Sequence, residues 1–242
     1  EVKNKLFAIV AHDLRNILAS LKGMLYLIRE SDLSGKELQT LSVHLKVSIQ
    51  QNSNIMENIL VWARQQMEGI TTDIKPLRVK PLVDKLLDSY LFPARQKGVT
   101  LANKVFPDIE VLADDDMLEL VLRNLLSNSL KFSGETDCIT VSAISKEDHV
   151  LFSVEDTGIG IPEAQKKTIF QSSTQTQRGT NNERGSGLGL NLCKEFIEKQ
   201  QGSIHFESEE GKGTTFYFTL PKANQQSKPD RHMEYINIKS DE

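Results

Sequence analysis

Cysteine is scarce in this sequence, and long apolar runs are missing. Only Cys138 and Cys193 occur, far apart and without the spacing of metal ligands, which favours a reducing compartment over a disulfide scaffold. No run approaches the roughly 18 apolar residues of a membrane span, and the opening residues do not resemble a secretory signal. We therefore expect membrane contact only through segments absent from this chain.

An excess of positive charge is also missing. The sequence has 29 lysines and arginines against 33 acidic residues, for a net charge of −4. Nucleic acids and anionic membranes attract basic surfaces, so neither is expected as a partner. What the 242 residues do have, 38% hydrophobic and 26% charged, is typical of a soluble protein with one large domain or two smaller ones.

Two amphipathic helices are predicted within residues 1–69. Apolar positions recur at alternating steps of three and four in two seams, separated by the turn-like sequence "SDLSG". The first seam is Phe7, Val10, Leu14, Ile17, Leu21, Met24 and Ile28, and the second is Leu38, Leu41, Leu45, Ser48, Asn52, Ile55, Ile59 and Trp62. The short connection predicts an antiparallel hairpin. Because each apolar stripe is too wide for one partner, we expect a second copy to complete a dimeric four-helix bundle.

Polar residues lie between the apolar seam positions in "AHDLRN". His12 falls at heptad position f, away from the seam, with Asp13 beside it and Asn16 one turn further on the same face. An imidazole with an unperturbed pKa around 6.5 is largely neutral at pH 7 and can act as a nucleophile. A neighbouring carboxylate can hold its other nitrogen. A solvated helix face with ordinary polar residues is the alternative at this point.

Residues 70–221 mix helices with strands. We expect helices at residues 82–90, 114–132 and 188–200, and strands at residues 99–105, 109–112, 139–144, 150–155, 203–207 and 214–220. This interleaving predicts an α/β sandwich. Residues 222–242 are polar and aperiodic, which is typical of a disordered tail. The predicted fold class is therefore α+β with two domains, at residues 1–69 and 70–221.

Three segments of the second domain carry chemistry. In "NLLSNSLKF", the helical period places Asn124, Asn128 and Lys131 on one face. Neutral amide oxygens suit Mg²⁺ that is shared with phosphates, and a lysine suits the phosphates themselves. The alternative is a set of ordinary surface residues on a helix.

The second segment is "EDTGIGIP", at the end of a predicted strand. Asp156 is placed to accept a hydrogen bond from an exocyclic amine, and Gly158 and Gly160 let the backbone approach a flat ligand. A tight turn without a ligand would need the same glycines, so this segment alone is weak evidence.

The third segment is "GSGLGL", which opens the predicted helix at residue 188. Its glycines, Gly185, Gly187 and Gly189, free the backbone, and the helix N-terminus offers unpaired N–H groups to an anion. A glycine-rich linker is the alternative. The preceding residues 171–185 contain no large apolar side chain, a composition typical of a mobile lid.

The order of these motifs resembles the transmitter core of two-component sensor histidine kinases over residues 1 to about 221. The second half resembles the Bergerat ATP-binding fold that the family shares with gyrase, Hsp90 and MutL. One departure is Ile17, which stands where the family usually has a proline after the motif histidine. In another, Phe170 is followed by Gln171, Ser172 and Ser173 where the family often has a second aromatic residue.

This resemblance implies a role for each motif. His12 would accept a phosphoryl group from ATP and pass it to an aspartate on the receiver domain of a response regulator. Asp13 would serve the kinase reaction and Asn16 a regulator-phosphatase activity. In the second domain, Asn128 would chelate Mg²⁺ with Asn124 and Lys131 at the phosphates, Asp156 would read the adenine amino group, and Gly158 and Gly160 would shape its pocket. The phosphates would be covered by Gly185, Ser186, Gly187, Leu188 and Gly189. The implied protein is a cytoplasmic homodimer, or the cytoplasmic part of a membrane-anchored sensor.

Two other functions compete with this one. A non-kinase ATPase of the gyrase or Hsp90 type would need a carboxylate to activate water at the position of Asn124, and an asparagine cannot abstract a proton. A degenerate scaffold without turnover would not need all four motifs intact. Acid-labile phosphate on the protein distinguishes the kinase from both.

Overall fold

The computed structural model describes residues 22, 23, 26, 35, 37, 72–171, 177–181, 183 and 189–223. Residues 22, 23, 26, 35 and 37 are helical. Gly35, which the sequence analysis placed in the connecting turn, therefore already belongs to a helix. The rest of the predicted hairpin, including His12, Asp13 and Asn16, lies outside the described residues. So does the predicted tail beyond Ala223.

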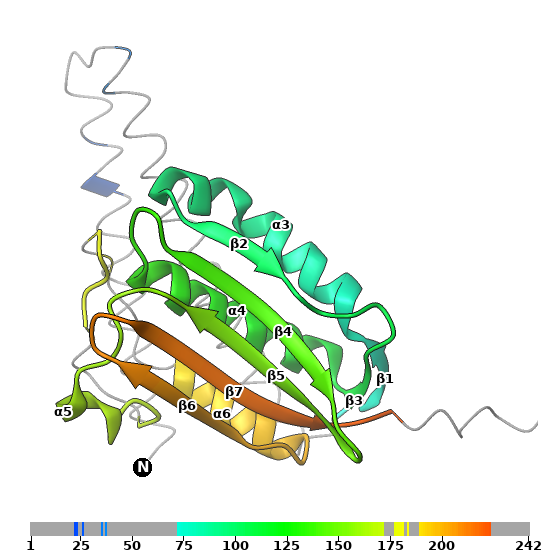
Figure 1. The fold of residues 1–242 in the computed structure, drawn as a ribbon. Helices are drawn as coiled ribbons and strands as arrows, with labels where there is room; N and C mark the ends of the chain where they lie inside the picture. Colours follow the sequence, from blue (N-terminus) through cyan, green and yellow to red (C-terminus); the bar gives the residue numbers. More distant parts are fainter. Residues whose placement is uncertain are drawn as a thin grey trace, which may run out of the picture.

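A mixed five-stranded sheet forms the centre of the second domain (Figure 1). Its order is β2-β4-β5-β7-β6, in which β2 and β4 are parallel and the other neighbours are antiparallel. The strands are β2 (Thr100–Asn103), β4 (Cys138–Ser145), β5 (His149–Asp156), β6 (Ile204–Glu209) and β7 (Gly213–Pro221). A separate antiparallel pair consists of β1 (Lys75–Arg78) and β3 (Glu110–Ala113).

Helices α4 (Asp115–Phe132) and α6 (Gly189–Lys199) lie behind this sheet in Figure 1, and α3 (Val79–Lys97) runs beside β2. The short α5 (Glu163–Lys166) follows β5. Apolar faces of the helices and the sheet meet in one core, in which the rings of Phe152 and Phe218 stack with centroids 4.4 Å apart. The predicted α/β sandwich is confirmed. No helix in the described ranges is long and apolar enough to cross a bilayer.

Helix α3 is longer at both ends than the predicted residues 82–90. Proline inside a helix removes one of its hydrogen bonds, because proline lacks the backbone N–H group. The structure carries the helix through Pro93 to Lys97, where Gly98 ends it in the left-handed conformation with a φ of 70°. Ala94 is buried in the core. Packing of this last turn therefore outweighs the hydrogen bond that proline removes, and it places Lys97 next to the end of α4.

The sequence analysis also missed strand β1, because "KPLR" lacks the alternation of apolar residues that marks a strand. At the C-terminal end of the domain's sequence, Lys222 forms a β-bridge with Val111, and Ala223 is buried. The folded part of the chain thus continues two residues past Pro221.

Candidate functional site: an ATP-binding pocket

Helix α4 presents a polar face beside its buried one. It begins after Asp114, whose carboxylate accepts a hydrogen bond from the N–H group of Met117 at 3.1 Å. Leucines at positions 118, 122 and 125 are completely buried, whereas Asn124, Asn128 and Lys131 are half-buried. The structure therefore brings the three predicted residues together on one face of α4.

Asp156 ends strand β5 and is only 6% exposed. Its Oδ1 atom accepts hydrogen bonds from the backbone N–H groups of Gly158 at 3.2 Å and Thr214 at 3.3 Å. Burial raises the pKa of Asp156 to about 6, although these two hydrogen bonds lower it. At pH 7 the side chain is therefore mainly a carboxylate in a poorly solvated place, which favours a ligand that donates a hydrogen bond to it.

The glycine turn after β5 holds this carboxylate against α4. A Cβ atom on Gly158 would lie 2.4 Å from the carbonyl oxygen of Phe132, the last residue of α4. Gly160 has a φ of +68°, and a Cβ atom there would lie 2.1 Å from the carbonyl oxygen of Glu209. Both glycines are thus required by close backbone contacts. These contacts hold the turn between α4 and the β6–β7 hairpin and so fix its position beside Asp156.

Ser129 is a buried residue next to Asp156 that the sequence analysis missed. It follows Asn128 on α4, is 1% exposed, and its side chain lies beside the carboxyl group of Asp156. Its hydroxyl oxygen is enclosed, and its hydrogen bond to the Asp156 carboxylate lowers the pKa of that group against the larger effect of burial. Ser129 therefore helps to hold the buried Asp156 carboxylate in its charged form beside α4. Only its helical position next to Asn128 could have suggested it.

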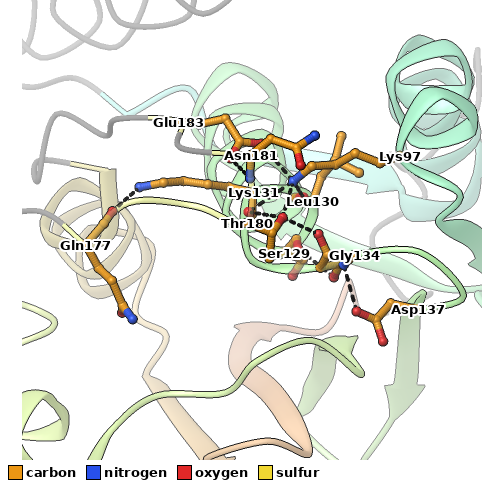
Figure 2. Close-up of polar contacts among 11 residues, drawn as sticks. Lys97, Ser129, Leu130, Lys131, Gly134, Asp137, Gln177, Thr180, Asn181 and Glu183 are labelled. Carbon is orange, nitrogen blue, oxygen red and sulfur yellow. Dashed lines mark hydrogen bonds and ion pairs between the residues drawn. The ribbon is translucent and has the colours of Figure 1, made fainter.

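Lys131 reaches away from the core toward segment 177–183, of which residues 177–181 and 183 are described (Figure 2). Its ammonium group donates to the carbonyl oxygen of Gln177 at 2.7 Å and lies 4.6 Å from the ring centroid of Phe132. Burial lowers the pKa of Lys131, while the negative charge of Glu183 raises it. The predicted lid composition is thus accompanied, in its described part, by defined contacts with α4.

Gly189 begins helix α6 next to α4. A Cβ atom at this glycine would lie 2.9 Å from the side-chain oxygen of Asn124, so the two helices meet closely at the polar face. The other predicted residues of this loop, Gly185, Ser186, Gly187 and Leu188, lie outside the described residues. Of the predicted site residues in this domain, the structure therefore describes Asn124, Asn128, Lys131, Asp156, Gly158, Gly160 and Gly189.

Comparisons with known families account for both halves of the chain. The model of the His Kinase A (phospho-acceptor) domain matches residues 2–68. The model of the histidine kinase-, DNA gyrase B- and HSP90-like ATPase matches residues 113–224, which include all seven described site residues. Together the two matches cover well over half of the sequence. The chain has the two domains of the transmitter core of two-component sensor histidine kinases.

Curated relatives of this kinase core are longer proteins. The adaptive-response sensory kinase SasA of Synechococcus elongatus is 33% identical over 227 residues, which are 90% of this chain and 58% of SasA. SasA of Synechocystis is 28% identical, over 91% of this chain and 60% of the relative. The sensor histidine kinase RcsC of Escherichia coli K12 is 28% identical, over 98% of this chain and 25% of RcsC. The kinase core thus spans about three fifths of SasA and a quarter of RcsC.

Solved structures agree with the fold. The catalytic domain of the histidine kinase ThkA is 28% identical, with a TM-score of 0.54 over 62% of this chain and 96% of the ThkA chain. Full-length ShkA, solved with AMPPNP, is 26% identical, with a TM-score of 0.62 over 90% of this chain and 46% of ShkA. ThkA in complex with the response regulator TrrA, at 22% identity and a TM-score of 0.64, supports the fold alone.

Proposed function

We propose that this chain transfers the γ-phosphoryl group of ATP to His12 and from there to an aspartate of a response regulator. The observation that carries the proposal is the buried Asp156 carboxylate, which lies with Ser129 beside the polar face of α4 that carries Asn124, Asn128 and Lys131. A phosphoacceptor domain precedes these residues in the same chain. AMPPNP in ShkA supports the donor, and a response regulator, TrrA, is the protein bound by ThkA, which shares this fold.

Each residue has one task in this reaction. Asp156 accepts a hydrogen bond from the adenine amino group, and Gly158 and Gly160 let the base approach the backbone. Lys131 neutralises negative charge on the phosphates. A neutral nitrogen of His12 bonds to the γ-phosphorus while the bond to the bridging oxygen of ADP breaks. Asp13 holds the other imidazole N–H and stabilises the cation that forms. Phosphoryl transfer needs alignment and charge neutralisation more than covalent help, and residues 185–189 are proposed to cover the phosphates.

Mg²⁺ is proposed at Asn128, with Asn124 nearby. The described residues hold no cluster of three or more His, Cys, Asp or Glu side chains that would bind a metal without the nucleotide. Amide oxygens from one helix face instead suit an ion that keeps several waters and shares the phosphates. When bound, Mg²⁺ would neutralise charge that develops on the phosphoryl oxygens.

The deciding experiment is incubation of the full chain with γ-labelled ATP, followed by acid and by base. A phosphoramidate on histidine is lost in acid and survives base, in contrast to a phosphoserine or phosphothreonine. We expect label that is acid-labile and base-stable. Release of inorganic phosphate without labelled protein would instead favour the ATPase, and the absence of both products would favour the scaffold.

Exchanging Asn128 for aspartate should change the dependence on Mg²⁺. The new carboxylate repels the phosphates when no metal is present, so we expect Asn128→Asp to weaken ADP binding in EDTA by about tenfold. Addition of Mg²⁺ should increase the ADP affinity of Asn128→Asp by a larger factor than it increases that of the parent. Titration calorimetry with and without Mg²⁺ measures both values. Gln201→Glu adds the same charge at an exposed position after α6 and serves as the control; equal effects of the two variants would remove Asn128 from the metal site.

We further propose that the kinase also dephosphorylates its regulator. An amide such as Asn16, one turn from His12, can position a water but cannot act as a base. Asn16→Ala should therefore keep autophosphorylation and slow the loss of phosphate from the purified phosphorylated regulator, by about tenfold or more. If the variant acts on the regulator as fast as the parent, Asn16 has no such role.

Assembly and location complete the proposal. The apolar stripes of residues 1–69 favour a homodimer through that domain, with residues 70–221 as the ATP-binding domain and 222–242 as a tail. The cytoplasm is the proposed location, because it holds ATP and response regulators.

A further inference from the structure

Lys97 is a buried lysine outside the site described above. It is the last residue of α3, and its side chain is 9% exposed. The ammonium group donates to the carbonyl oxygens of Leu130 at 2.7 Å and Lys131 at 3.1 Å. These carbonyls belong to the last turn of α4, where backbone oxygens have no partner within the helix and attract a positive charge. Lys97 thus stabilises the end of the helix that carries the phosphate-site residues.

The same ammonium group holds segment 177–183 (Figure 2). It donates to the hydroxyl of Thr180 at 2.8 Å and pairs with the carboxylate of Glu183 at 2.7 Å. Thr180 in turn donates from its hydroxyl to the carbonyl oxygen of Ser133 at 2.7 Å and from its N–H group to that of Lys131 at 3.0 Å. The segment is therefore attached to α4 both directly and through Lys97.

Glu183 stands between two lysines. Its negative charge acts on Lys131 as well as on Lys97. Gly179 brings the segment close, since a Cβ atom there would lie 2.5 Å from Cγ of Lys131 and 2.4 Å from Oε2 of Glu183. The Glu183 carboxylate nevertheless pairs with Lys97, and the ammonium of Lys131 points to the carbonyl oxygen of Gln177. A neutral carbonyl is a weaker competitor for Lys131 than a carboxylate would be.

We propose that Lys97 is a positioning residue for phosphate binding, which keeps Glu183 from pairing with Lys131 and so leaves Lys131 available to the phosphates of the nucleotide. This inference rests on the proposed function, because it requires a nucleotide in the pocket. An unneutralised Glu183 would act twice against binding: it would take the ammonium of Lys131, and it would repel the phosphates.

The test compares ADP with adenosine, which lacks the phosphates, by titration calorimetry on the full chain. Lys97→Met should weaken ADP binding about tenfold and change adenosine binding by less than about twofold. Glu183→Gln should tighten ADP binding by about threefold, because it removes the competing carboxylate. The double variant should bind ADP more tightly than Lys97→Met alone. The matched control is Lys85→Met, because Lys85 lies on α3 like Lys97 but is exposed and pairs with Glu119 of α4. This variant should change the affinity for neither ADP nor adenosine.

A purely structural role of Lys97 predicts different changes in the ADP and adenosine affinities of these variants. If Lys97 only holds the fold together, Lys97→Met weakens ADP and adenosine equally, Glu183→Gln weakens ADP binding, and the double variant is no better than the single one; any of these results overturns the proposal. Because Glu183→Gln keeps Lys97 and its carbonyl contacts, it decides the matter even if Lys97→Met does not fold. If the parent does not bind ADP, the proposed function itself is refuted. If the parent, Lys97→Met and Glu183→Gln all bind ADP with the same affinity, only this inference is refuted.

Discussion

The His12→Gln variant is expected to lose all acid-labile label while binding ATP as tightly as the parent. Glutamine keeps a polar side chain at a position that the sequence predicts to be exposed, but its amide nitrogen has no free lone pair with which to attack phosphorus. The predicted nucleotide contacts all lie in the other domain, so ATP affinity should stay the same. Autoradiography after base treatment and titration calorimetry with ADP measure the two properties.

The other histidines provide the controls. His149 pairs with Asp148 at 2.6 Å, and His205 stacks on Tyr217 with ring centroids 5.0 Å apart. Both lie on strands of the ATP-binding domain and outside the motif. His149→Gln should therefore label like the parent. Acid-labile label that persists in His12→Gln, or that disappears in His149→Gln, would move the phosphoacceptor away from His12.

The sequence predicted the elements of the ATP-binding domain better than their contacts. Helix α4 could be read from its acidic start and its apolar period, and the face with Asn124, Asn128 and Lys131 followed from helical geometry. Asp156 and its glycines were recognisable because a strand, an acid and two glycines occur in order. These features are local, so that a stretch of about 20 residues determines them.

Residues brought together from distant parts of the chain could not be predicted in the same way. Lys97 and Glu183 have no motif, and only the extension of α3 past Pro93 places the lysine near segment 177–183. Thr214 lies opposite Asp156 because β5 and β7 are paired in that register. Ser129 was missed because a serine on a helix usually faces water, and its burial depends on how α4 packs against the sheet.

Asp156→Asn should lose nucleotide affinity. The amide oxygen can keep the hydrogen bonds from Gly158 and Thr214, but the amide nitrogen then stands where the second carboxylate oxygen was. Two donors would face each other when the adenine amino group arrives, and a charge-assisted hydrogen bond would be lost. Such a loss costs roughly 1.5–3 kcal/mol, so ADP binding should weaken by about 10- to 100-fold. Glu155→Gln removes one charge at the exposed neighbouring residue and should leave the affinity unchanged.

The same substitution should stabilise the domain without ligand, and more so as the pH rises. Because the pKa of Asp156 is about 6 in the folded chain and 3.8 is the ordinary value, the folded state holds this proton more tightly than the unfolded state. The carboxyl group therefore contributes its full stability only below pH 3.8, and this contribution is lost as the pH rises through 6. Asparagine does not titrate, so the stability of the variant relative to the parent should rise by about 2 kcal/mol between pH 4 and pH 8.

Hydrogen exchange of the backbone amides in β5 and β7 at several pH values measures this difference in the free energy of unfolding. If Asp156→Asn lowers the affinity for ADP and raises the free energy of unfolding, the buried carboxylate destabilises the fold but serves ligand binding. A difference in unfolding free energy that stays constant from pH 4 to pH 8 would mean that burial does not raise the pKa of Asp156. Unchanged ADP binding in the variant would instead separate the adenine from this residue.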